Sequence, residues 1–150
     1  MVVKPLVVHP QTATIPALAA CAASRQGKFG PMDHLIWEKG YNAGRNLSED
    51  NMLKLAGELG LDLARFRADL DGEDCKRTLK QNEQELRALG VHATPGFFIN
   101  GRFLSGAQPI ENFKRLIDEE LRKANDAIGR GVKVDDYYGE AVLKAGKKSI

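Results

Sequence analysis

Cysteine is scarce in this sequence, and this limits the thiol and metal chemistry that the chain can perform. The two cysteines, Cys21 and Cys75, lie too far apart along the chain for a Cys-X-X-Cys motif or a thiolate zinc site. Long hydrophobic runs are absent as well, because no stretch approaches the roughly 18 apolar residues of a membrane helix. Residues 1–10 also lack the pattern of a signal peptide. We therefore expect no dithiol chemistry, membrane span or export signal within this chain.

Neither sign of charge dominates. Lys and Arg total 22 against 20 for Asp and Glu, and the net charge of +2 is spread along the chain. Phosphate binding needs clustered cations, so we do not expect nucleic acid as a partner. The three histidines, His9, His34 and His92, have no acidic partners at ligand spacing, and we therefore predict no metal site and no cofactor. The content of 43% hydrophobic and 28% charged residues is typical of a globular domain.

The first part of the chain predicts one strand followed by helices. Val2–Val8 is a β-branched run that ends before a proline, which predicts a buried strand with Pro5 at an edge. Apolar residues at helical spacing then predict a series of helices, with Ser48 and Asp62 as N-caps. Cys75 falls on the apolar stripe of the longest of them.

The character of the sequence changes after Gly90. Two short apolar runs flank Asn100-Gly101, and this pair tolerates the positive φ angles of a tight turn, so the segment predicts a β-hairpin. A helix is predicted from Pro109 to Ile128. Residues 129–150 are polar and form a predicted C-terminal tail.

Several separated motifs resemble the DsbA-like thiol-disulfide oxidoreductase family, which has a thioredoxin fold with an all-helical insertion. They occur in the order of that family: Gln26 to Phe29, Leu59 to Asp62, Thr94-Pro95, Phe97 to Gly101 and Gly106 to Pro109. The resemblance implies an α/β fold with a mixed sheet. It places a truncated domain over residues 1–128, with the helical insertion at about 12–89.

The resemblance also implies that a strand and a Cys-X-X-Cys helix precede residue 1. In the family that strand is central, between the strands assigned here to Val2–Val8 and Phe97 to Asn100. Its loss would leave buried backbone groups unpaired, each at a cost of about 1 to 3 kcal/mol. Three outcomes remain open: a separate or trimmed piece supplies the strand, the Val2–Val8 strand moves into its place, or two copies form a homodimer by strand exchange.

The same resemblance assigns the site residues. It implies that the Thr94-Pro95 bond is cis and that the backbone of His92, Ala93 and Thr94 positions an extended substrate peptide. The alternatives are that Pro95 ends a loop in trans and that His92 is an exposed loop residue. No catalytic cysteine is assigned.

Cys21 and Cys75 form either a structural disulfide or two buried thiols, and the sequence favours neither. Trp37, Phe97 and Phe98 are predicted to be core aromatic residues.

The function that the resemblance implies is thiol-disulfide exchange on exported, cysteine-containing proteins or peptides, in the periplasm or another exported location, by the complete protein. The family is enzymatic, but without the motif this chain is expected to be redox-inactive alone. The alternative is a non-catalytic thioredoxin-like module that binds a peptide or protein.

Overall fold

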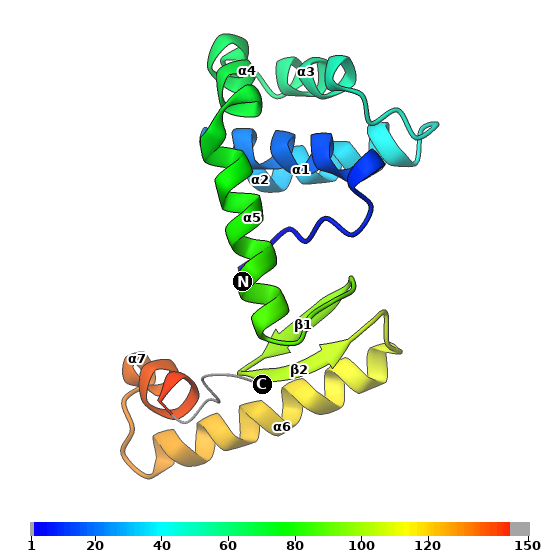
Figure 1. The fold of residues 1–150 in the computed structure, drawn as a ribbon. Helices are drawn as coiled ribbons and strands as arrows, with labels where there is room; N and C mark the ends of the chain where they lie inside the picture. The colour runs from blue at the N-terminus through cyan, green and yellow to red at the C-terminus, as the bar shows by residue number, and fades with distance from the viewer. Residues whose placement is uncertain (1, 145–150) are drawn as a thin grey trace. The chain divides into compact units, whose positions relative to one another are not determined.

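The computed structural model describes residues 2–144 and divides the chain into two compact units, Met1–Leu86 and Arg87–Ile150 (Figure 1). The first unit is helical. Its elements are listed here in chain order: α1 (Pro10–Ser24), α2 (Phe29–Leu35), the π-helix η1 (Ile36–Tyr41), α3 (Glu49–Glu58), α4 (Leu63–Asp71) and α5 (Glu73–Ala88), which continues past the boundary between the units.

Helix α1 is the centre of the first unit, because it contacts α2, α3 and α4. Its alanines explain this position: Ala19, Ala22 and Ala23 are completely buried, and their small side chains let neighbouring helices approach closely. The largest fully buried side chains surround it, and all belong to this unit: Phe66, Met32, Met52, Leu55 and Cys75.

Local signals in the sequence set the helix starts. The Ser48 hydroxyl accepts a hydrogen bond from the backbone N–H of Asn51 at 3.4 Å, and the Asp62 carboxylate accepts one from Arg65 at 3.0 Å. Both predicted N-caps are therefore confirmed. The Gln26 side chain also exchanges two hydrogen bonds with the backbone of Asp62, which fixes the end of α1 against the start of α4.

The predicted strand at Val2–Val8 is wrong. Within the described residues this segment has no regular structure, and Val2 is 85% exposed. A strand needs a partner for its backbone groups, and Pro5 also removes one donor. Lys4 instead forms an ion pair with Glu85 of α5. The described strands form one antiparallel pair, so the α/β character of the fold is present within residues 2–144 but the mixed sheet stays a prediction.

The second unit contains one hairpin and one long helix. Strands β1 (Gly96–Ile99) and β2 (Arg102–Ser105) pair antiparallel, with Phe98 opposite Phe103. Asn100 and Gly101 form the predicted two-residue turn at φ +47° and +81°, so the predicted hairpin is confirmed. Helix α6 (Ile110–Gly129) follows, and then the short α7 (Val134–Tyr137) and the π-helix η2 (Tyr138–Leu143).

The three aromatic residues predicted for the core are not buried. Trp37 is 55% exposed, and Phe97 and Phe98 are each more than a third exposed. Trp37 lies on η1 and makes an edge-to-face contact with Tyr41, with ring centroids 5.3 Å apart. The prediction failed because the apolar character of a side chain does not say whether another element covers it.

Candidate functional site

The four residues predicted to position a peptide lie together in one exposed loop. His92, Ala93, Thr94 and Pro95 join α5 to β1, and all four are exposed. The Thr94-Pro95 peptide bond is cis. The Pro95 carbonyl accepts a hydrogen bond from the backbone N–H of Gly106 at 2.8 Å, so the loop is anchored to the residue that follows β2, at the open end of the hairpin.

The register of the hairpin decides which backbone groups face outward. In a two-residue hairpin the pair that flanks the turn is hydrogen-bonded, and bonded pairs then alternate with unbonded ones. Ile99 and Arg102 flank the turn. The hydrogen bond between Gly106 and Pro95 fits the same alternation. The N–H and C=O groups of Gly96 and Phe98 therefore point to the free edge of β1, and Thr94 continues that edge into the loop.

Helix α6 covers one face of the hairpin with only part of its apolar surface. The Phe97 ring contacts Phe113 edge-to-face at 4.9 Å, and Leu116 is buried. At about 100° per residue, Ile110, Ile117 and Leu121 lie on the flank of α6 next to β1. All three are exposed. The second unit thus leaves an apolar flank and a free strand edge on the same side.

The opposite face of the hairpin carries two aromatic rings. Phe98 and Phe103 pair across the strands with ring centroids 5.0 Å apart, and both are exposed. Gly96 lies beside them, and a Cβ at this position would lie 3.1 Å from the Phe103 ring, so a larger residue here would have to displace the ring slightly. Sequence reasoning had found these residues as strand formers, but it did not find that their face is uncovered.

The two cysteines form a disulfide that joins α1 to α5. Their Cα atoms are 5.8 Å apart, Cys75 is completely buried and Cys21 is half-buried. Of the two alternatives left open by the sequence, the structural disulfide is the one the structure shows. The chain therefore contains no free cysteine.

A family model described as "DSBA-like thioredoxin domain" matches residues 5–118. The chain belongs to this family.

Three curated relatives contain a region similar to this DSBA-like domain. The Na(+)/H(+) antiporter NhaA of Herminiimonas arsenicoxydans is 33% identical over 121 residues, which cover 81% of this chain and 19% of the relative. The Na(+)/H(+) antiporter NhaA 3 of Salinispora tropica is 36% identical over 134 residues, or 89% of this chain and 20% of the relative. A third, NhaA 1 of Salinispora arenicola, is 36% identical over 105 residues. The chain spans about a fifth or less of the length of these curated relatives.

An ionic cluster ties the hairpin of the DSBA-like domain to α6. The Arg102 guanidinium donates to Glu119 at 2.6 Å and to Glu120 at 3.0 Å, and Lys123 donates to Glu120 at 2.7 Å. The Arg102 bond holds the pKa of Glu119 below its ordinary value. For Glu120, the bonds from Lys123 and Arg102 lower the pKa against the opposing effect of burial. Sequence reasoning missed this cluster, because strand β2, a loop and the first turns of α6 separate Arg102 from Glu119 and Glu120 along the chain.

The remaining histidine and acidic side chains of the described residues do not form a metal site. His34 pairs with Glu38 at 3.2 Å on the surface of the first unit. Within residues 2–144, no group of three or more His, Cys, Asp or Glu side chains is arranged to hold a metal ion. The described helices include none that is long and apolar enough to cross a membrane.

Proposed function

We propose that this DSBA-like domain holds an extended peptide of an exported, cysteine-containing protein along the loop that His92, Ala93, Thr94 and Pro95 form. The observation that carries this proposal is the exposed position of Thr94 where the free edge of β1 enters the loop, because its outward N–H and C=O groups have no backbone partner within the described residues. An extended peptide can pair with such an edge as an added strand. In this reading His92 lies at the rim, where it would contact the peptide backbone.

We further propose that the sheet is incomplete and that a strand from outside residues 1–150 pairs with Gly96 and Phe98. The exposed flank of Ile110, Ile117 and Leu121 supports this, because a strand next to β1 would cover it. The relatives are about five times as long as the matched region, so a segment of a longer polypeptide can supply the strand. Exchange between two copies is the other source, and sedimentation of the chain at several concentrations distinguishes them, because only exchange gives a dimer.

Thiol-disulfide exchange would need thiols supplied with that segment. The exchange step requires an attacking thiolate, and both cysteines of this chain are already joined in a disulfide within the helical unit. We expect no turnover in insulin reduction by the chain alone. Turnover that disappears in a Cys21→Ser/Cys75→Ser variant would contradict this part of the proposal, and turnover that persists would indicate a contaminating reductase.

The peptide-holding role is tested by NMR on the labelled chain. Adding an extended peptide that contains S-methylated cysteine should shift the amide signals of His92, Ala93 and Thr94. Thr94→Pro removes one outward N–H group and should weaken the binding about fivefold or more. Ala107→Pro is the matched control in the exposed loop that follows β2 and should leave binding unchanged. Shifts spread over the helical unit instead would contradict the proposal.

A non-catalytic binding module is the second candidate, and the disulfide-bonded state of both cysteines favours it. The two candidates share the peptide-holding loop and differ in whether a dithiol faces it. If peptide binding persists when the completing segment is added but no insulin reduction follows, the binding module is correct.

The relatives suggest where such a domain belongs. We propose that it is an appended part of an antiporter-like protein and that it lies on the exported, periplasmic side of the membrane, where disulfides persist. An antiserum against the domain should then detect a membrane-associated polypeptide several times larger than 16.5 kDa. A cytosolic band of that smaller mass would contradict the proposal.

A further inference from the structure

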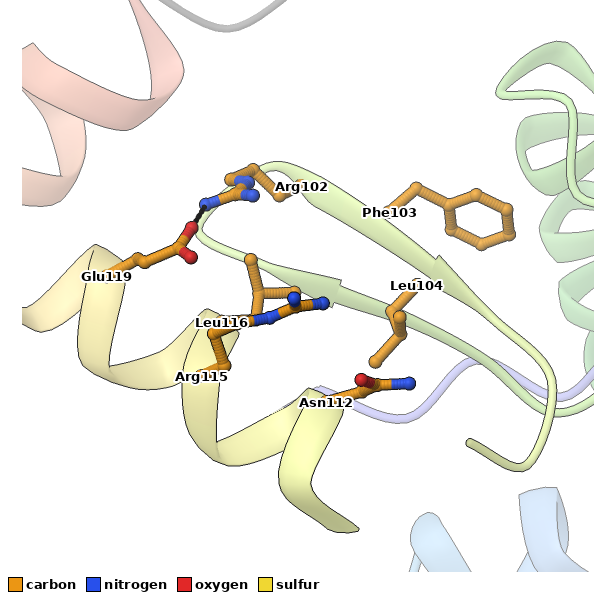
Figure 2. Close-up of a pocket in the computed structure, with 7 residues that line it drawn as sticks. All are labelled: Arg102, Phe103, Leu104, Asn112, Arg115, Leu116 and Glu119. Carbon is orange, nitrogen blue, oxygen red and sulfur yellow. Dashed lines mark hydrogen bonds and ion pairs between the residues drawn. The ribbon is translucent and has the colours of Figure 1, made fainter. Parts of the chain in front are cut away.

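A groove runs between β2 and α6, on the side of the hairpin opposite to the free edge of β1 (Figure 2). Its volume is about 340 Å³, and it is lined by three residues of β2 and four residues from successive turns of α6: Arg102, Phe103, Leu104, Asn112, Arg115, Leu116 and Glu119. Leu116 is buried and Leu104 half-buried. The aliphatic side chains therefore line the inside of the groove, while Asn112, Arg115 and Glu119 supply its polar wall.

The two arginines of the groove differ in their partners. Arg102 is already bound to Glu119 and Glu120, as the dashed line in Figure 2 marks for Glu119. Arg115 makes no hydrogen bond or ion pair with any residue of the described chain, and it is attracted only at longer range to Glu119. Its guanidinium is exposed beneath β2, and a planar guanidinium has several N–H donors suited to a carboxylate. The groove thus contains one guanidinium, that of Arg115, whose N–H donors are available to bind an anion.

The edge of β2 above Arg115 is free. By the alternation described above, the N–H and C=O groups of Phe103 and the N–H group of Ser105 point away from β1. Neither residue has a backbone partner on that side within the described part of the chain, although the Ser105 carbonyl accepts from the Gln108 side chain at 2.8 Å. An added strand at this edge would lie about 4.8 Å from β2, over the side chains of Asn112 and Arg115.

We propose that this groove binds an extended segment of a partner protein as an added strand and selects a segment with a carboxylate side chain. Phe103 and Ser105 supply backbone hydrogen bonds, and every second side chain of the added strand points toward α6. An acidic side chain at one of those positions reaches Arg115, and charge complementarity therefore selects an acidic segment. This goes beyond the proposed function, because it uses the other edge of the hairpin and none of residues 92–98.

The experiment uses the full chain and two fluorescent probes. One is a short, C-terminally amidated peptide of alternating Thr and Val with a central Glu, and the other carries Gln in its place. Fluorescence anisotropy should show about tenfold tighter binding of the Glu peptide, the factor that corresponds to one charge-assisted hydrogen bond. Arg115→Gln should remove this difference. The matched control is Lys114→Gln, which changes the neighbouring cation that pairs with Glu111 outside the groove and should leave the difference intact.

Mapping by NMR separates this inference from the proposed function. The Glu peptide should shift the amide signals of Phe103 and Ser105 and leave those of Thr94 and Phe98 unchanged. Equal binding of the two peptides, or a difference that survives Arg115→Gln, would overturn the proposal. Concentration-dependent self-association that Arg115→Gln abolishes would also overturn it, because the occupant would then be a second copy of the chain.

Discussion

The two units differ in how completely they bury their apolar residues. In the first, α1 is surrounded by other helices, and the disulfide joins it to α5. In the second, the hairpin rests on one helix, and large side chains remain exposed on both sides, among them Phe98 and Ile117. Burial of apolar surface is the main source of stability, so the first unit should be self-sufficient and the second should gain most from a partner. The loop proposed to hold a peptide and the incomplete burial therefore lie in the same unit.

The largest effect is expected in the core of the first unit. Phe66→Ala leaves a cavity at a completely buried position and should cost about 3 to 5 kcal/mol. Urea unfolding followed by the fluorescence of Trp37, the one tryptophan of the chain, measures this loss. Hydrogen exchange of the β1–β2 amides should change little. An equal loss of protection in both units would show that they unfold together, and it would contradict the view that the first unit is stable by itself.

Removing the disulfide should cause the second-largest loss of stability. A Cys21→Ala/Cys75→Ala variant releases a closed loop with a sequence separation of 54, and we expect a loss of about 2 to 4 kcal/mol in the first unit. The same urea titration with and without reductant measures it, since reduction of the wild-type chain should reproduce the variant. A variant as stable as the oxidised chain would mean that helix packing alone sets the stability of this unit.

Neighbouring residues of α6 test the uncovered flank of the second unit. Leu116 is 7% exposed and Ile117 is 48% exposed. Leu116→Ala should therefore cost about 2 to 3 kcal/mol, and Ile117→Ala less than about 1 kcal/mol. Hydrogen exchange of α6 is the measurement. If a completing segment is added, the cost of Ile117→Ala should rise toward that of Leu116→Ala, and no rise would argue against the missing strand.

The smallest expected effect concerns the ionic cluster. The pKa values of Glu119 and Glu120 are lowered from 4.5, so the folded state favours both carboxylates in their charged form. This stabilisation is present above pH 4.5 and is lost as the pH falls through the lowered values. Glu120→Gln should speed exchange of the hairpin amides at pH 7 by less than about tenfold, and the difference from wild type should shrink in acid. If the difference in exchange rate between the variant and wild type grows in acid, the charged carboxylates do not stabilise the hairpin.

Features of the fold that depend on short-range chemistry were predictable from the sequence. The Asn100-Gly101 turn and the Ser48 and Asp62 caps each need only a few adjacent residues, and all three occur where predicted. The disulfide was left open, because no sequence pattern fixes the distance between two Cα atoms on separate helices.

The failures and omissions share one cause. The strand at Val2–Val8 and the burial of Trp37 both depended on a covering or pairing element that the described chain does not place there. The family motif located the exposed loop of Thr94 and Pro95, and the role of this loop in holding a peptide stays a prediction. The periodicity of α6 showed one apolar side, but only the three-dimensional register divided it into a covered part and an exposed flank.

The disulfide also closes a covalent ring in the first unit, which runs along the chain from Cys21 of α1 to Cys75 of α5 and returns through the two sulfur atoms. A protease that cuts the exposed connection at residues 42–46 would therefore leave two pieces held as one molecule. Such a nicked chain should migrate undivided on a non-reducing gel and separate into fragments only after a reductant is added. The helical unit can thus lose a peptide bond in an oxidising compartment without losing either half of itself.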